Sequence, residues 1–148
     1  MIQPIVVGCD FDGTIAEKNY SGIVDTLPEI GKQIGRCLEI ITELRAGYPI
    51  LFVLWTVRSG EVLRDAMSWL WYRNCFMDGY NTQTNLNFID STKLMCDYFI
   101  DDHNVDWVMA GNTDITPERW EEIREFLIQK AEERLLEYSS QGQSDNNH

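Results

Sequence analysis

Short apolar runs alternate with amphipathic stretches along most of the chain. Continuous apolar runs at residues 5–9, 50–55 and 98–100 predict strands, and the run at 50–55 is expected to be buried on both faces. Apolar residues spaced by three or four positions predict helices over residues 28–47 and 60–73. Strands that alternate with helices indicate a mostly parallel sheet with right-handed crossovers. The pattern therefore predicts an α/β fold.

The pattern beyond the third strand predicts one further helix. Thr116 and Pro117 suit an N-cap and a first helical turn. Apolar residues then continue at helical spacing to about residue 138: Trp120, Ile123, Leu127, Ala131 and Leu135. Polar residues 78–87 predict an exposed loop, and polar residues 139–148 predict a disordered tail. We therefore expect a single domain over residues 1–138, which includes a C-terminal helix at about 116–138.

Composition narrows the class of protein. A length of 148 residues with 44% hydrophobic residues suits one globular domain, and no segment approaches the roughly 20 apolar residues of a membrane span. The four cysteines form no Cys-x-x-Cys pair and no basic leader is visible, so we expect free thiols and a cytoplasmic location. The net charge of −12 argues against broad binding to nucleic acid, which depends on Lys and Arg.

Two carboxylates follow the first predicted strand. Asp10 and Asp12 precede Gly13, which allows a sharp turn, and the hydroxyl of Thr14. Ligands bind at the carboxyl ends of strands in open α/β sheets. These residues predict either a capped turn or a site in which both carboxylates face one cleft.

Polar residues also surround the ends of the other two predicted strands. The second strand ends at Thr56, ahead of Val57 and Arg58, where a hydroxyl and backbone amides near a helix start suit an anion. If the three strands are neighbours, five acids, a threonine and a lysine converge on one edge of the sheet: Asp10, Asp12, Asp101, Asp102, Asp106, Thr56 and Lys93. Each residue alone has an ordinary structural explanation, and their joint placement favours a site.

Taken in order, these motifs resemble those of the haloacid dehalogenase-like (HAD) hydrolase superfamily. Residues 10–14 match its first motif, a strand followed by Asp-x-Asp-Gly-Thr, without a departure. The later motifs match in sequence order: Thr56, then Lys93, then Asp101-Asp102. The resemblance covers about residues 5–107 and looks closest to small bacterial and phage members. It implies a Rossmann-like fold of three layers with no separate cap domain, to which the C-terminal helix is an addition.

The resemblance implies a phosphatase mechanism with Mg²⁺ as the cofactor. Asp10 would be the nucleophile that forms an aspartyl-phosphate, and Asp12 would be the general acid and then the general base. Mg²⁺ would bind Asp10, the backbone carbonyl of Asp12 and Asp102, with Asp101 and Asp106 behind these ligands. The phosphoryl oxygens would be held mainly by two side chains, with turn residues beside them: Thr56 and Lys93, with Gly13, Thr14, Val57 and Arg58.

Three functions stay open from the sequence. The first is hydrolysis of a small phosphomonoester, such as a nucleotide or a sugar phosphate. The second is removal of 3′-phosphates from nucleic-acid ends, against which the net charge of −12 weighs. The third is not enzymatic: a receiver-like domain that holds an aspartyl-phosphate without hydrolysing it, or a metal-binding domain.

The expected site is open because the chain has little room for a cap. Only 41 residues separate Thr14 from Thr56, and 36 separate Thr56 from Lys93, whereas an independent cap needs at least about 50. Tyr20, Arg58 and Tyr80 are candidates to reach a substrate, with ordinary packing roles as the alternative. A second subunit could also close the site, so a homo-oligomer stays open, and a membrane partner is not expected.

Overall fold

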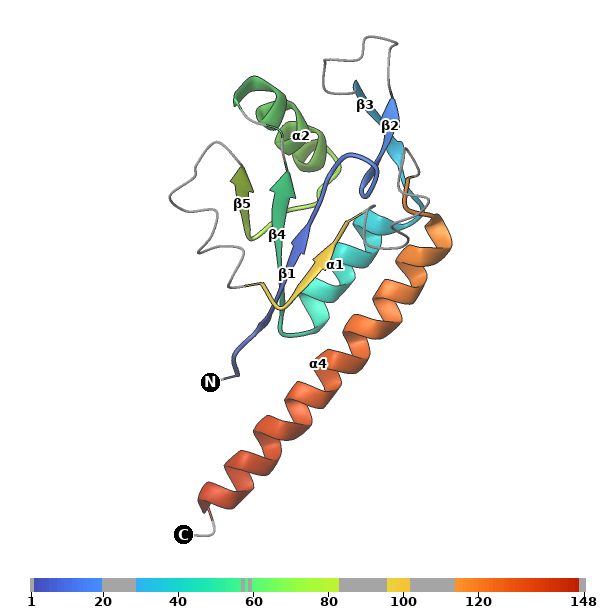
Figure 1. Ribbon diagram of the computed structural model, residues 1–148. Coiled ribbons are helices and arrows are strands. Elements are labelled where there is room, and N and C mark those ends of the chain that lie inside the picture. The colour runs from blue at the N-terminus through green and yellow to red at the C-terminus, as the bar shows by residue number, and fades with distance from the viewer. Residues whose placement is uncertain are drawn as a thin grey trace.

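A parallel sheet forms the centre of the fold. The computed structural model describes residues 2–19, 29–56, 58, 60–82, 96–101 and 114–146. Four strands follow the order β5-β4-β1-β6 (Figure 1). Their bounds are Ile5–Cys9 for β1, Ile50–Thr56 for β4, Gly79–Thr82 for β5 and Tyr98–Ile100 for β6. All three pairings are parallel, which confirms the expected α/β fold with a mostly parallel sheet.

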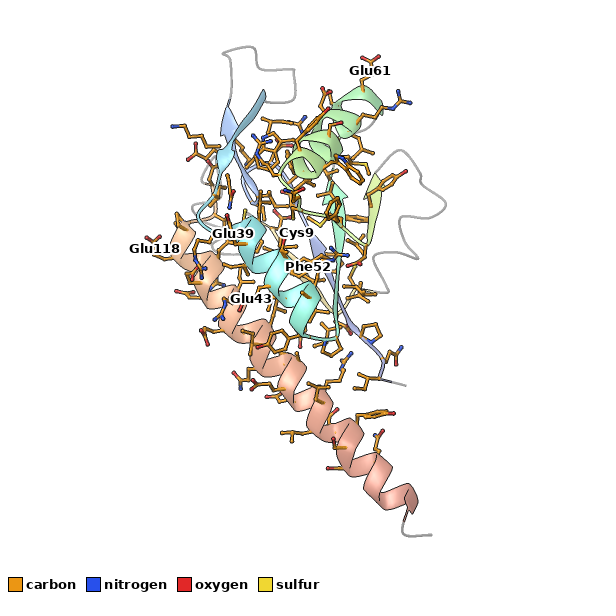
Figure 2. All side chains as sticks on the ribbon, turned by 180° about the vertical axis from the view of Figure 1, so that it is seen from behind. Cys9, Glu39, Glu43, Phe52, Glu61 and Glu118 are labelled. Carbon is orange, nitrogen blue, oxygen red and sulfur yellow. The ribbon has the colours of Figure 1, made fainter. Side chains whose placement is uncertain are left out.

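Three helices accompany the sheet within the described residues: α1 (Cys37–Gly47), α2 (Gly60–Tyr72) and α4 (Pro117–Asn146). α2 confirms the helix predicted at residues 60–73. α1 and α4 lie side by side on one face of the sheet, behind it in Figure 1 and in front of it in Figure 2. Strands and helices share one core of buried side chains, which includes Val7, Cys9, Phe52, Leu54, Ile41, Leu44, Trp120 and Leu127. No helix in this described part is long and apolar enough to cross a bilayer.

Burial alternates along β4. Phe52 and Leu54 are fully buried, whereas Leu51 is 37% exposed and Trp55 is half-buried. Successive side chains of a strand point to opposite faces of the sheet, and the core with α1 and α4 covers only one of these faces. The expectation that this run is buried on both faces is therefore wrong at Leu51.

An antiparallel hairpin stands where the sequence predicts the start of a helix. β2 (Ala16–Asn19) pairs with β3 (Glu29–Gln33), and α1 begins only at Cys37, so the helix predicted from residue 28 is wrong over its first part. The apolar positions ahead of α1 have helical spacing by coincidence. Gly31 indicates the strand instead, because a Cβ atom there would lie 2.4 Å from the carbonyl oxygen of Glu17.

β5 lies within the polar segment for which a loop is predicted. The prediction is wrong for residues 79–82, and residues 83–87 lie outside the described part. The sequence Gly-Tyr-Asn-Thr has no apolar run because β5 pairs with only one described neighbour. Its start is fixed by Asp78, whose N–H donates to the Phe52 carbonyl at 2.7 Å and whose carboxylate accepts from the Phe52 N–H at 2.8 Å.

α4 begins as predicted and ends later. Thr116 acts as the N-cap, since its Oγ1 accepts a hydrogen bond from the Arg119 N–H at 3.1 Å. The helix continues to Asn146, so both the expected end near residue 138 and the disordered tail are wrong for residues 139–146. Once a helix has formed, each added residue gains a hydrogen bond at little cost, and no proline interrupts this segment. The C-terminal half of α4 extends away from the rest of the fold (Figure 1).

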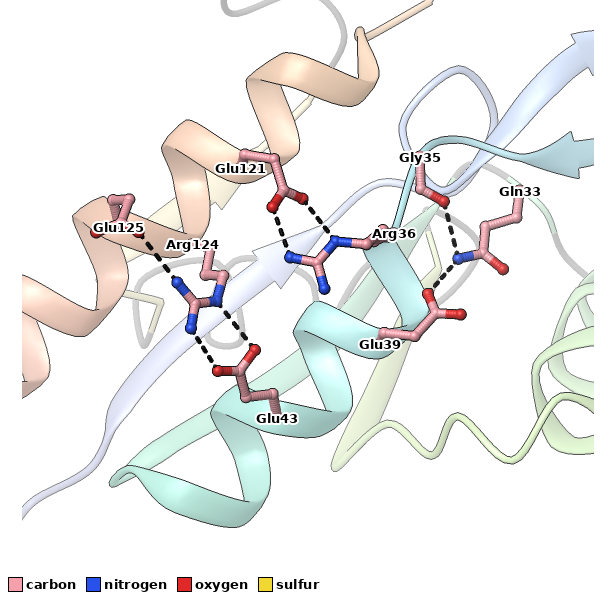
Figure 3. A network of polar contacts seen from close by, with 8 residues as sticks. All are labelled: Gln33, Gly35, Arg36, Glu39, Glu43, Glu121, Arg124 and Glu125. Atoms are coloured by element: carbon pink, nitrogen blue, oxygen red, sulfur yellow. Dashed lines mark hydrogen bonds and ion pairs between the residues drawn. The ribbon is translucent and has the colours of Figure 1, made fainter.

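Ion pairs join the beginning of α1 to α4 (Figure 3). Arg36 donates to both carboxylate oxygens of Glu121, at 2.5 and 3.3 Å. Further along, Arg124 donates to both oxygens of Glu43, at 2.6 and 3.0 Å, and this hydrogen bonding lowers the pKa of Glu43. The two bidentate pairs, about one turn apart on α4, fix the register of α4 against α1.

Candidate functional site

The carboxyl ends of neighbouring strands bring two predicted site residues together. Cys9, the last residue of β1, lies opposite Leu54 of β4 and Ile100 of β6. The next residue, Asp10, continues the ladder, because its N–H donates to the Ile100 carbonyl at 2.9 Å. Asp101 directly follows Ile100, so Asp10 and Asp101 stand at adjoining strand ends, and both are half-buried.

A tight turn carries the chain away from Asp10. The Phe11 carbonyl accepts hydrogen bonds from three successive N–H groups, those of Thr14, Ile15 and Ala16, at 3.2, 2.9 and 3.2 Å. Gly13 has a φ of +81°, which confirms that this position needs glycine. The segment is therefore an ordinary hydrogen-bonded turn that also positions Asp12. The structural interpretation of this sequence and the interpretation as a site are compatible.

Asp12 forms a buried ion pair with Arg58. Arg58 Nε and Nη2 donate to the two Asp12 carboxylate oxygens at 2.7 and 2.8 Å. Arg58 is 2% exposed and Asp12 is 8% exposed, so water screens this pair little. The Arg58 guanidinium also donates to the Val62 carbonyl at 3.3 Å and lies 5.4 Å from the centre of the Phe11 ring. Both carboxylate oxygens of Asp12 are thus held in one orientation.

The position of Arg58 depends on Thr56 at the end of β4. The Thr56 hydroxyl accepts a hydrogen bond from the Arg58 N–H at 3.1 Å. This hydrogen bond holds the Arg58 backbone at the end of β4, and from there its side chain reaches Asp12. The sequence singled out Arg58 as a phosphate or substrate ligand and did not predict its pairing with Asp12.

The turn is also held from α4, a contact that the sequence did not predict. Trp120 Nε1 donates to the Thr14 carbonyl at 2.7 Å, and the Ile115 N–H donates to the Gly13 carbonyl at 2.7 Å. Trp120 is fully buried. Its apolar spacing in the helix predicts only a core position, and no sequence pattern tells which carbonyl an indole N–H will reach.

Comparison with known proteins adds one relative. No protein-family model and no curated protein matches the chain. A solved structure of a conserved protein from Bacteroides thetaiotaomicron is 32% identical, matches 86% of this chain and 92% of its own, and superposes with a TM-score of 0.63. The chain belongs to the family of this Bacteroides protein.

The match to the Bacteroides relative includes α4. The 14% of this chain outside the match amounts to about 21 residues, fewer than the 30 of α4. Part of the last helix therefore belongs to what the two proteins share. The description of the Bacteroides relative names no activity, so the relationship supports the fold and leaves the chemistry to be argued from the site.

The residues that the sequence singles out fall into three groups. The described structure gathers seven of them around the turn and the strand ends: Asp10, Asp12, Gly13, Thr14, Thr56, Arg58 and Asp101. The others lie outside the described residues: Tyr20, Val57, Lys93, Asp102 and Asp106. Tyr80 is described on β5 and is 55% exposed. Thr14 is fully buried, and its hydroxyl makes no hydrogen bond with any residue that the structure describes. Its backbone N–H and carbonyl are both taken up by hydrogen bonds to Phe11 and Trp120.

Cysteine chemistry does not contribute to this site. Cys9 is buried beneath Asp10, and burial, reinforced by nearby Cys37, Asp10, Cys75 and Asp101, raises the pKa of its thiol well above the usual range. Burial also raises the pKa of Cys37 to about 12 and that of Cys75 to about 11. All four cysteines are free thiols, as expected. The neutral Cys9 thiol packs in the core and is unsuited to act as a nucleophile.

Proposed function

We propose that this protein is a Mg²⁺-dependent phosphatase of the HAD superfamily, with a Rossmann-like fold of three layers. The observation that carries the proposal is the meeting of Asp10 and Asp101 at adjoining strand ends, with Asp12 two residues along a tight turn. The strand order supports it too. From β1 the chain proceeds to β4 and β5 on one side, and β6 returns on the other, which makes the β1/β6 boundary a switch point where α/β sheets bind ligands.

The two aspartates would divide the chemistry between them. Asp10 would attack the phosphorus atom of a phosphomonoester, forming an acyl phosphate as the bond to the leaving oxygen breaks. Asp12, released from its bidentate pair with Arg58 and protonated, would give a proton to that oxygen. It would then take a proton from the water that hydrolyses the acyl phosphate, which releases phosphate and restores both carboxyl groups.

The donors at the strand ends suit Mg²⁺. Asp10, the Asp12 backbone carbonyl and Asp102 would hold the ion, with Asp101 and Asp106 behind them, and all of these donors are the oxygen ligands that Mg²⁺ prefers. The described residues fit this role, because Asp10 and Asp101 place two carboxylates at one edge of the sheet. When bound, Mg²⁺ would offset the repulsion between carboxylates and a phosphate dianion.

Thr56 is well placed to hold a phosphoryl oxygen. Its hydroxyl accepts from the Arg58 N–H, and the described residues offer no acceptor for the hydroxyl hydrogen. Thr56 would therefore donate to the phosphoryl group, and Lys93 would supply positive charge in the transition state. The N–H groups of Gly13 and Thr14 already donate within the turn, so a further backbone hydrogen bond to the phosphoryl group would come from Val57.

We also propose that no separate cap covers the site. Between Thr14 and Thr56 the described chain is used by the β2–β3 hairpin, by α1 and by β4 itself. An open site would admit a substrate of any size and leave specificity to side chains at the rim, of which Tyr80 is an exposed candidate.

Release of phosphate from p-nitrophenyl phosphate tests the proposal. The wild-type protein should turn over with Mg²⁺ and stop when EDTA is added, and Asp10→Asn should abolish turnover because an amide is a poor nucleophile. Asp65→Asn, an exposed acid on α2, is the matched control and should keep the wild-type rate. A rate for Asp10→Asn near that of Asp65→Asn would refute the nucleophile assignment.

The class of substrate needs a second assay. A panel of phosphorylated metabolites together with 3′- and 5′-phosphorylated oligonucleotides distinguishes a metabolite phosphatase, which we propose, from a nucleic-acid end phosphatase. A receiver-like domain would give a third result: incorporation of phosphate on Asp10 from acetyl phosphate without catalytic release. That outcome would contradict the proposed hydrolysis.

A further inference from the structure

The first turn of α4 reaches the carbonyl groups of the site turn. Gly13 and Thr14 follow Asp12 directly, and their carbonyls accept hydrogen bonds from the Ile115 N–H and from Trp120 Nε1, both at 2.7 Å. Ile115 and Trp120 lie just before and just inside α4. The backbone that carries Asp12 is therefore bound by groups more than a hundred residues away in sequence.

The turn cannot supply these donors itself. Within the turn, the N–H groups of Thr14, Ile15 and Ala16 are all directed to the Phe11 carbonyl, and the Gly13 N–H donates to the Ala16 carbonyl. Thr14 and Trp120 are both fully buried, so water cannot replace the indole. A buried carbonyl without a donor is costly, and the turn would shift to recover one.

α4 is a firm support because its side chains Leu127 and Ala131 are buried in the core that it shares with α1 and the sheet. The bidentate pairs Arg36–Glu121 and Arg124–Glu43 also join α4 to the beginning and middle of α1, directly C-terminal to Trp120 (Figure 3). Asp114, just ahead of the helix, accepts from the Lys18 N–H at 3.4 Å and so reaches the β2–β3 hairpin as well. The Trp120 indole is thus held in place independently of the turn it binds.

We propose that Trp120 is a positioning residue for the phosphatase reaction, which makes α4 part of the functional site. Its indole N–H fixes the Thr14 carbonyl, and through two peptide units it sets the direction of the Asp12 carboxylate relative to Asp10. The role rests on the proposed function of these aspartates. It goes beyond the motifs that the chain shares with HAD hydrolases, since α4 lies outside them.

Removal of the indole N–H tests this role. Trp120→Phe keeps an aromatic ring in the core, and a benzothienylalanine at position 120 keeps the whole bicyclic shape with sulfur in place of N–H. We expect both variants to lower kcat by roughly tenfold to a hundredfold with KM changed less than about twofold, because a small displacement of Asp12 affects the chemical step. Hydrogen exchange of the turn amides, followed in the peptide over residues 9–18, should become faster in both.

A loss of stability alone would not produce this pattern, and a control variant separates the two causes. Leu44→Ala opens a cavity in the same core, near the C-terminal end of α1, and leaves the hydrogen bonds from Ile115 and Trp120 to the turn in place. It should lower the melting temperature while leaving kcat and the exchange of residues 9–18 unchanged when measured well below that temperature. Variants at position 120 that resemble Leu44→Ala in kcat and exchange would overturn the proposal.

The exchange measurement keeps this proposal distinct from the proposed function. If the wild-type protein releases no phosphate from any substrate, the phosphatase assignment fails. The hydrogen exchange of residues 9–18 then decides by itself whether the indole holds the turn. Exchange that is faster in the benzothienylalanine protein than in the wild type shows that it does, and unchanged exchange refutes this role. If Asp10→Asn abolishes turnover and the position-120 variants keep the wild-type kcat, the positioning role fails and the phosphatase stands.

Discussion

Replacement of Arg58 with methionine should destabilise the protein strongly, because it leaves a buried carboxylate unpaired. Arg58→Met removes both hydrogen bonds to Asp12, at 2.7 and 2.8 Å, and the side chains involved are 3% and 11% exposed. The methionine has nearly the length of the arginine stem, so little packing is lost. The contact with the Phe11 ring and the bond to the Val62 carbonyl go with the guanidinium.

The expected size follows from this burial. Removal of one partner of a buried ion pair costs about 3–5 kcal/mol, because the other charge is left without compensation. Domains have a total stability of only about 5–15 kcal/mol, so the variant should lose a large share of it. For a chain of this length the melting temperature should fall by roughly 6–20 °C.

Urea unfolding at pH 7 in EDTA measures the change without interference from bound cations. The control is Arg36→Met, which breaks an ion pair of similar geometry at the exposed end of α1 and should have little effect. A double variant, Asp12→Leu with Arg58→Met, should recover much of the stability lost by Arg58→Met, since it removes the unpaired charge. If Arg58→Met costs no more than Arg36→Met, the buried pair does not stabilise the fold and the reasoning is refuted.

Three further predictions concern other parts of the molecule. Burial alone would raise the pKa of Asp78, but hydrogen bonds from Arg45 and the Phe52 N–H lower this pKa overall. The stability that Asp78 contributes is therefore present above its ordinary pKa and is lost as the pH falls through the lowered value. Asp78→Asn should therefore flatten the acid end of the stability curve, between roughly pH 5 and pH 2, whereas Asp65→Asn should leave it unchanged. Iodoacetamide at neutral pH should label the native protein slowly and at half-buried Cys96 first, and denaturation should expose all four thiols; rapid labelling of Cys9 in the native state would contradict its burial. Gly31→Ala should destabilise the β2–β3 hairpin, since its Cβ atom would meet a backbone oxygen at 2.4 Å. Gly47→Ala, with nothing within 4 Å, should instead stabilise α1 by up to about 1 kcal/mol, and equal effects would refute the steric argument.

Apolar runs were the most reliable guide to the fold. The strands at residues 5–9 and 98–100 agree with the structure, and the strand predicted at 50–55 ends one residue later, at Thr56. These strands contribute side chains to the core, so their apolar composition makes them recognisable in the sequence. The sequence does not predict the polar strands for the same reason: β2 reads Ala-Glu-Lys-Asn and β5 reads Gly-Tyr-Asn-Thr, so neither contains an apolar run.

The candidate site could be predicted as far as parallel topology extends. Once β1 and β6 are neighbours, Asp10 and Asp101 must meet, because the carboxyl ends of parallel strands share an edge. The partners of Asp12 and Thr14 follow no such rule. Whether Arg58 turns inward to Asp12, and whether Trp120 reaches the Thr14 carbonyl, depends on side-chain geometry in three dimensions.

The position of β1 in the sheet also has a consequence for synthesis of the chain. β1 is made before the other described strands and is a central one: it pairs on one side with β4 and on the other with β6, which is made some ninety residues later. Closure of so long a loop is entropically costly and slow. The turn at the site is completed later still, because the Thr14 carbonyl is bound only after Trp120 has been synthesised. We therefore expect nascent chains to hold an incomplete site until α4 emerges, so that the proposed activity would arise only when α4 has docked.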